Sequence, residues 1–160
     1  MTDRETIQTD VCNHSQGLSV WLLDHDGLMT PRLVDAFGPL KAVQTSATDT
    51  ESTYQRNSQL RRRSDDALIL KATLEVGKSE VPATLIDRLR EGDNLFGQLL
   101  HDFGISVRVT TRGLFQTPSG QFGRNVTMAR TGHERRLCRV KETLSLDADL
   151  RQLLRKDWSS

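Results

Sequence analysis

Apolar and polar residues alternate along several stretches of the chain, with the period of two that is typical of β-strands with one buried face. This alternation predicts strands over residues 39–48, 58–64, 67–76 and 105–116, and a β-hairpin over residues 124–144. The hairpin is expected to turn near Gly132. The polar stretch 49–57, DTESTYQRN, is expected to connect two strands.

Other stretches carry apolar residues at the spacing of a helix face, or residues that mark helix ends. They predict helices over residues 17–25, 29–38, 82–92, 94–104 and 146–158. In the second of these, Thr30 is expected to be the N-cap, Pro31 the first helical residue and Gly38 the end.

Several of the predicted strands are joined by short turns, which only antiparallel pairs can use. The sequence therefore predicts an α+β fold, in which a single domain has an antiparallel sheet of about six strands with helices packed on it. A chain of 160 residues is long enough to bury a core of this kind. The domain is expected over residues 17–160, preceded by a polar, flexible segment over residues 1–16.

Composition and charge exclude some classes of partner. With 22 basic and 21 acidic residues the formal net charge is +1, so no global field favours nucleic acid. The run Arg61–Arg63 stands alone, without the interleaved aromatic residues of a nucleic-acid site. No apolar run approaches the roughly 20 residues that span a membrane. The N-terminus is polar and resembles no secretory signal, so a cytoplasmic location is expected.

Cysteine and histidine residues show no spacing typical of a metal or redox site. Cys12 and Cys138 form no CxxC motif, and the four histidines show neither HxxxH nor HExxH spacing. We therefore expect no metal ligands. Cys138 falls on an apolar strand face, where we expect a small core residue and not a nucleophile.

Charged side chains fall on the apolar faces of three predicted strands, where an ion is costly to bury. These residues are Arg62, Arg124, Arg130 and Glu142. Arginine binds carboxylates in planar, bidentate geometry, so inward arginines predict a pocket for a small organic acid. Two structural explanations stay open. Arg62 and Glu142 could form an ion pair with each other, and Arg124 and Arg130 could reach solvent near strand ends.

Four segments resemble the chorismate lyase family (chorismate–pyruvate lyase, or 4-hydroxybenzoate synthase). They are LLDHDGLMTPRLVDAFG, QLRRRSDD, EVPATLIDRLREGDNLFGQLL, and FGRNVTMARTG followed by VKETL. They span about residues 18–146 in the order that the family has them. Because no single motif is very specific, the serial order carries the resemblance.

The resemblance implies roles for individual residues. Arg62 is implied to bind the ring carboxylate, with Arg61 or Arg63 as alternatives, and to act with Glu142 in catalysis. Glu142 is implied to lie near the hydroxyl and ether end of the ligand. The other implied substrate-binding residues are Met29, Phe96, Gly97 and Arg124.

The resemblance also implies an activity, namely a carbon–oxygen lyase that eliminates pyruvate from chorismate to give 4-hydroxybenzoate, without a cofactor. Two alternatives stay open. One is a non-catalytic domain of the same fold that binds a small aromatic acid, and the other is a lyase for another cyclic carboxylic acid. The chain departs from the family pattern at Lys141, which replaces a threonine, at Phe96, which replaces a leucine, and in a longer hairpin before Glu142. The sequence leaves the oligomeric state open.

Overall fold

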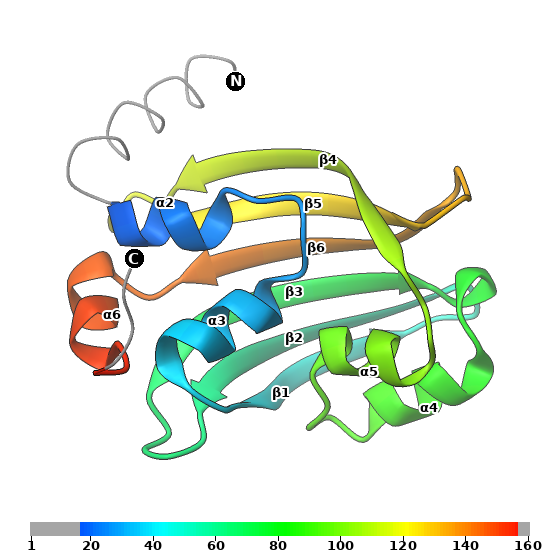
Figure 1. Ribbon diagram of the computed structural model, residues 1–160. Helices are drawn as coiled ribbons and strands as arrows, with labels where there is room; N and C mark the ends of the chain where they lie inside the picture. The colour runs from blue at the N-terminus through cyan, green and yellow to red at the C-terminus, as the bar shows by residue number, and fades with distance from the viewer. Residues whose placement is uncertain (1–16, 157–160) are drawn as a thin grey trace.

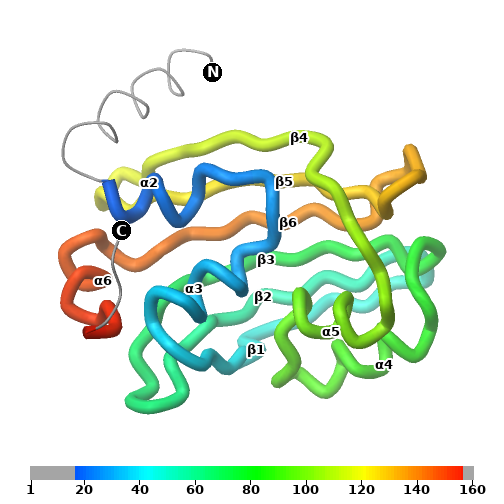
Figure 2. The backbone as a smooth tube through the Cα atoms, viewed as in Figure 1, coloured from blue at the N-terminus to red at the C-terminus, as the bar shows by residue number. Residues whose placement is uncertain are grey.

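The computed structural model describes residues 17–156 and shows one sheet of six antiparallel strands (Figure 1). The strands are β1 (Leu40–Asp49), β2 (Thr53–Arg62), β3 (Leu68–Gly77), β4 (Val107–Gln116), β5 (Phe122–Arg130) and β6 (Arg136–Leu144). Their order across the sheet is β1-β2-β3-β6-β5-β4. The chain thus forms two three-stranded meanders that meet where β3 pairs with β6, as the tube in Figure 2 shows.

Five α-helices accompany the sheet. They are α2 (Gly17–Leu23), α3 (Met29–Phe37), α4 (Ala83–Arg90), α5 (Phe96–Asp102) and α6 (Asp147–Leu153), and a 3₁₀ turn, η1 (Lys78–Glu80), follows β3. Figure 1 shows α2, α3, α4 and α5 on one face of the sheet, with α6 near α2 at one end. The expected α+β architecture of a single domain is confirmed. Across residues 17–156, each helix is too short or too polar to cross a membrane.

The structure corrects two details of the sequence prediction. Part of the stretch 49–57 is not a connection, because β2 already begins at Thr53. Thr30 is not an N-cap, because α3 begins one residue earlier and no side chain caps it. The predicted end of α3 at Gly38 is confirmed, and its φ of 90° explains why glycine stands there.

Two expectations lie wholly or partly outside the described residues. The expected flexible segment covers residues 1–16. The predicted helix over residues 146–158 is shorter in the structure, where α6 ends at Leu153, and only its last two residues lie outside the described range. Cys12 lies in the first of these segments.

Buried apolar residues form two clusters on the helical face of the sheet. One cluster joins α2, α3 and α6 to the sheet and includes Leu22, Leu33 and Leu144. The other joins α4 and α5 to the sheet and includes Leu85 and Leu99. Between the clusters runs a row of residues that pair across four neighbouring strands. This central row consists of Ser58 (β2), Ala72 (β3), Glu142 (β6) and Arg124 (β5).

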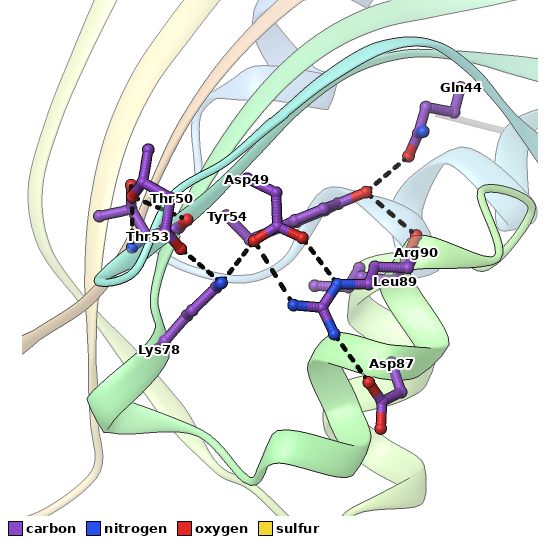
Figure 3. Close-up of polar contacts among 9 residues, drawn as sticks. All are labelled: Gln44, Asp49, Thr50, Thr53, Tyr54, Lys78, Asp87, Leu89 and Arg90. Carbon is purple, nitrogen blue, oxygen red and sulfur yellow. Dashed lines mark hydrogen bonds and ion pairs between the residues drawn. The ribbon is translucent and has the colours of Figure 1, made fainter.

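Polar contacts tie the tip of the β1–β2 hairpin to the helical layer (Figure 3). The carboxylate of Asp49 accepts a hydrogen bond from Nε of Arg90 at 2.7 Å and another from Lys78. These bonds, foremost that from Arg90, lower the pKa of Asp49 to about 2. The hydroxyl of Tyr54 donates to Oε1 of Gln44 at 3.0 Å. The end of β1 is therefore joined to η1 and α4, and the start of β2 is joined to β1.

The packing around Gly123 leaves no room for a larger residue. We therefore expect Gly123→Ala to lower the unfolding temperature of the protein strongly. A Cβ atom at this position would overlap both the ring of Phe115 and the carbonyl oxygen of Glu142. The backbone oxygen cannot move without breaking the pairing of β5 with β6. Overpacking of this kind costs about 3 kcal/mol or more. Thermal and urea unfolding would measure the loss.

Gly17 provides the matched control for this substitution. It lies at the start of α2, and a Cβ atom there would meet no heavy atom within 4 Å. Because alanine favours a helix over glycine, Gly17→Ala should leave stability unchanged or raise it by up to about 1 kcal/mol. Equal stability of the two variants would contradict the steric account of Gly123.

Candidate functional site

A cavity lies between the helical face of the sheet and the first residues of α3 and α5. Its walls are mostly apolar, and the residues that line it from the helical layer include Met29 and Thr30 from α3 and Phe96 and Gly97 from α5. The sheet contributes residues of β2, β3, β5 and β6. The charged residues of the wall are Arg56, Arg124 and Glu142.

The central row explains why the sheet is hollow at this point. Ser58 and Ala72 are small, whereas the rows on either side place leucines at Leu60, Leu70 and Leu74 on the same face. Leucine-sized side chains in the central row would reach α3 and α5 and close the gap. The cavity is therefore a consequence of two small residues at the middle of a six-stranded sheet.

Arg56 is the most unusual residue of this cavity. Its side chain is only 3% exposed, yet it has a single hydrogen bond, from Nη2 to the carbonyl oxygen of Asn94 at 2.7 Å. Its Nε and Nη1 atoms are buried without a partner among residues 17–156. Burial lowers the pKa of the guanidinium from its ordinary value, but arginine stays charged at neutral pH. A buried cation without an anion is costly, so this group is suited to bind an anionic ligand.

The loop between α4 and α5 positions the guanidinium of Arg56. Asn94 offers its carbonyl oxygen to Arg56, and its side-chain amide donates to the carbonyl oxygen of Arg88 at 2.7 Å. Gly92 gives the loop its sharp turn, with φ at 91°. The loop thus holds one edge of the guanidinium and leaves the other nitrogens free.

Glu142 supplies a carboxyl group to the same cavity. It is 7% exposed, and its Oε1 accepts a hydrogen bond from Nε of Arg124 at 2.9 Å. Burial raises the pKa of Glu142, and the charge and hydrogen bond of Arg124 oppose that rise. Its other oxygen, Oε2, has no hydrogen-bond partner in the described part of the chain. The carboxyl can therefore hold a proton and still offer one oxygen to a ligand.

Arg124 also lines the cavity, but its side chain is already occupied by the protein. It is 0% exposed, and besides Glu142 it donates from Nη1 to the carbonyl oxygen of His25 and from Nη2 to that of Gly27, each at 2.8 Å. All three nitrogens therefore have protein acceptors. Of the two arginines in this wall, only Arg56 has nitrogens without a hydrogen-bond partner among residues 17–156.

The structure brings together most of the site residues that the sequence singled out. The residues that line the cavity as expected are Met29, Phe96, Gly97, Arg124 and Glu142. Arg130 lies beyond Met128 on β5 and does not line it. Cys138 is buried in the core, as expected, and burial raises the pKa of its thiol to about 12, which keeps it protonated.

The prediction that Arg62 points into the site is corrected, because Arg62 does not line the cavity. Its guanidinium forms an ion pair with Asp65 and donates to the carbonyl oxygen of Leu153. Arg62 is on the predicted face of β2. The cavity ends at the paired residues Leu60 and Leu70, and Arg62 lies beyond them. The alternative in which Arg62 pairs with Glu142 is also wrong, since that partner is Arg124.

The two alternatives to Arg62 also lie elsewhere. Arg61 donates to Oε1 of Gln59 at 2.9 Å, and Arg63 donates to the carbonyl oxygen of Leu40 at 3.0 Å. Neither of them lines the cavity.

Arg56 and Ser58 line the cavity but were not predicted from the sequence as site residues. Both are on the buried face of β2, and Arg56 belongs to the polar stretch that was expected to be a connection. The sequence carried a weak signal of a strand here, because Tyr54 and Leu60 are separated by an even number of positions. The structure buries both of them, together with Arg56 and Ser58 at the alternate positions between them. Polar residues that line a cavity obscure the hydrophobic alternation that identifies a strand.

The departures from the family pattern mostly lie away from the cavity. Lys141 is on the opposite face of the sheet, with its ammonium 5.4 Å from the centre of the Phe115 ring. The longer hairpin turns at Gly132, as expected, and its tip lies beyond the cavity-lining part of β5 and β6. Only Phe96 changes the wall itself.

No protein-family model matches the chain, and a search of curated proteins finds no match either. Among residues 17–156, no three His, Cys, Asp or Glu side chains are grouped so that they could hold a metal ion.

Ala72→Leu should fill the cavity without unfolding the protein, so an acid that binds in the cavity should no longer bind. Ala72 lies between Ser58 and Glu142 in the central row, so a leucine there would occupy the space between Arg56 and Glu142. A hydrophobic side chain that enters an existing cavity should change stability by less than about 1.5 kcal/mol. Thermal unfolding would measure stability, and isothermal titration with 4-hydroxybenzoate, the acid that the resemblance implies, would measure binding.

Ala47→Leu is the control for this substitution, because Ala47 lies on an exposed part of β1. It should bind the ligand as the unchanged protein does. Undiminished binding by Ala72→Leu would show that the ligand lies elsewhere.

Proposed function

We propose that the protein binds a small cyclic carboxylic acid in this cavity and eliminates pyruvate from chorismate to give 4-hydroxybenzoate. One observation carries the proposal. A buried arginine, Arg56, has two nitrogens without partners among residues 17–156, and it lines a mostly apolar cavity that Glu142 also lines. A fixed cation with free donors and an acid in one apolar site is the arrangement that an aromatic or cyclic carboxylate requires.

The spacing of the two groups suits a ring. Arg56 and Glu142 are separated by two strand spacings and by one two-residue step along the strands. Regular sheet dimensions put their Cα atoms about 12 Å apart. Both side chains line the same cavity, and in our proposal a six-membered ring lies between them, with its carboxylate toward Arg56 and its oxygen substituent toward Glu142.

The reaction balances without a co-reactant. The bond between ring carbon C3 and the ether oxygen breaks, the hydrogen at C4 leaves as a proton, and the ring becomes aromatic. The departing enolpyruvate takes up one proton and becomes pyruvate. In our proposal Arg56 takes the place that the resemblance gave to Arg62 and holds the ring carboxylate. Protonated Glu142 donates to the departing ether oxygen and regains a proton from C4.

A second candidate function is binding without turnover, by a domain of the same fold. The observation that favours it is the shortage of free cations. Chorismate carries two carboxylates, whereas Arg124 already donates from all three nitrogens and only Arg56 has free ones. A monocarboxylic aromatic acid would require only one cation, which Arg56 provides. A lyase for another cyclic carboxylic acid also stays open, since Phe96 narrows the wall relative to leucine.

Direct incubation with chorismate tests the proposal. We expect the purified protein to release 4-hydroxybenzoate and pyruvate in equal amounts, faster than chorismate decomposes alone, with no added cofactor. Saturable binding of 4-hydroxybenzoate without product formation would favour the binding domain instead. Turnover of a related cyclic acid but not of chorismate would change the substrate and keep the site. Neither turnover nor binding would overturn both functions.

A further inference from the structure

Arg124 joins Glu142 to the loop that precedes α3, and it contacts both through hydrogen bonds. Its Nε donates to Oε1 of Glu142 at 2.9 Å, while Nη1 and Nη2 donate to the carbonyl oxygens of His25 and Gly27 at 2.8 Å. We infer that Arg124 is a positioning residue, which determines the oxygen of Glu142 that carries the acidic proton and aligns that oxygen with the cavity wall. The inference rests on the proposed function of Glu142.

The hydrogen bond from Arg124 makes the two oxygens of Glu142 unequal. The carbonyl oxygen of a neutral carboxyl group is a better hydrogen-bond acceptor than its hydroxyl oxygen, so the donor at Oε1 favours the proton on the other oxygen. The proton of the neutral carboxyl therefore belongs on Oε2, which has no partner within residues 17–156. Oε2 is thus the oxygen that can donate to a ligand, and Arg124 leaves the carboxyl little freedom to rotate.

The loop that Arg124 holds also forms part of the wall. Its last residue, Leu28, lines the cavity and is followed by Met29, the next wall residue. Within the loop, the backbone N–H of Gly27 donates to Nδ1 of His25 at 3.0 Å. A further tie comes from Arg112 on β4, which pairs with Asp24 at 3.0 Å. Both arginines contact this loop, but only Arg124 also contacts Glu142.

The charged groups around Glu142 are few. Arg124 faces it from β5, Arg56 faces the same cavity from β2, and Cys138 lies on its own strand as a neutral thiol. His25 reaches it only through Arg124, and burial first of all, followed by the charge of Arg124, lowers the pKa of His25 to about 4. The cavity residues of α3, α5 and β3 carry no charge. Arg124 is therefore the only ion that contacts Glu142 among residues 17–156.

Arg124→Lys tests the role, because lysine keeps the charge but cannot make three directed bonds at once. We expect kcat with chorismate to fall about tenfold or more and KM to change little. We also expect the midpoint of the Glu142 carboxyl titration, followed by carbon-13 NMR, to rise. Arg112→Lys is the control, since it loosens the same loop without touching Glu142, and it should leave that midpoint unchanged.

Other outcomes decide against the inference. A raised KM with unchanged kcat would show that Arg124 binds the substrate directly. An unchanged titration midpoint would show that Arg124 does not influence the carboxyl group of Glu142. If Arg124→Lys fails to fold, the unchanged protein still provides a test. Its Arg124 Nε–H signal should shift with the same midpoint as the Glu142 carboxyl, and independent midpoints would overturn the inference. Lack of turnover by the unchanged protein would count against the proposed function alone, because both NMR titrations remain measurable.

Discussion

Arg56→Met is expected to make the free protein more stable and to remove its affinity for the ligand. The guanidinium is buried with two nitrogens unpaired, so methionine, which has a similar length and no charge, should relieve an electrostatic cost. We expect a gain of about 1–3 kcal/mol in the free energy of unfolding, even after loss of the bond to Asn94. Residues that are retained for binding commonly cost stability in this way.

The loss of affinity should be large, because Arg56 would be the group that pairs with the ligand carboxylate. Loss of one partner of a buried, hydrogen-bonded charge pair costs about 2–5 kcal/mol, so Kd should rise at least about 30-fold. Isothermal titration with 4-hydroxybenzoate would measure Kd, and urea unfolding without ligand would measure stability. Opposite signs for the two effects distinguish a ligand anchor from a residue that supports the fold.

Arg62→Met is the matched control for Arg56→Met. Both arginines are on β2 and on the same face of the strand, but Arg62 pairs with Asp65 near the surface. Its loss should cost about 1 kcal/mol or less and leave Kd unchanged within about twofold. If Arg62→Met abolished binding and Arg56→Met did not, the anchor would be Arg62 and the cavity would not be the site.

Glu142→Gln is expected to reduce turnover of chorismate by about 10²- to 10⁴-fold, the usual contribution of a general acid. Its side-chain oxygen can still accept the hydrogen bond from Arg124, so the geometry of the cavity should persist. The amide can donate a hydrogen bond to the ligand but cannot give up a proton. We therefore expect binding of 4-hydroxybenzoate to remain while kcat falls. Unchanged turnover would exclude Glu142 as the acid.

The pH dependence of stability provides an independent check on Glu142. Burial raises its pKa above that of the unfolded chain, so the folded state keeps the proton at higher pH. The contribution of Glu142 to the free energy of unfolding should therefore be greatest below the unfolded pKa of about 4.3. This contribution should be lost as the pH rises through the folded pKa. Glu142→Gln should remove this component of the slope. The component should also be opposite in sign to that of Asp49, whose lowered pKa stabilises the protein above the unfolded value.

The fold followed from the sequence because its strands are long and carry clear alternation. Along β6, the buried positions Cys138, Val140, Glu142 and Leu144 have period two, and the inward direction of Glu142 could be inferred from it. The short turns between neighbouring strands then favoured an antiparallel sheet. Helix starts were less certain, since α3 begins without the side-chain cap that Thr30 would have provided.

The site could be predicted only in part, because alternation gives the face of a residue but not its distance from a cavity. Arg62 and Arg56 are both on the inner face of β2, three alternate positions apart. Which of them meets the cavity depends on cross-strand partners, and these set Ser58 beside Ala72 and Leu60 beside Leu70. Such pairings are not encoded in any one strand.

The role of Arg124 shows a second limit. Its position on β5 correctly placed it in the interior, next to Glu142. The acceptors of its other nitrogens are carbonyl oxygens almost a hundred residues earlier, at His25 and Gly27. A contact between a side chain and a distant backbone leaves no pattern in residue types, so the sequence could not distinguish a substrate anchor from a positioning residue.

The central claim is that Arg56 is the unpaired anchor for a carboxylate in this cavity. A crystal structure of the protein with 4-hydroxybenzoate would test it most directly. We predict that the ligand carboxylate accepts a hydrogen bond from Nε or Nη1 of Arg56, with the hydroxyl end of the ring toward Glu142. A carboxylate bound to Arg62 or to any site outside the cavity, with the nitrogens of Arg56 left to water, would contradict the claim.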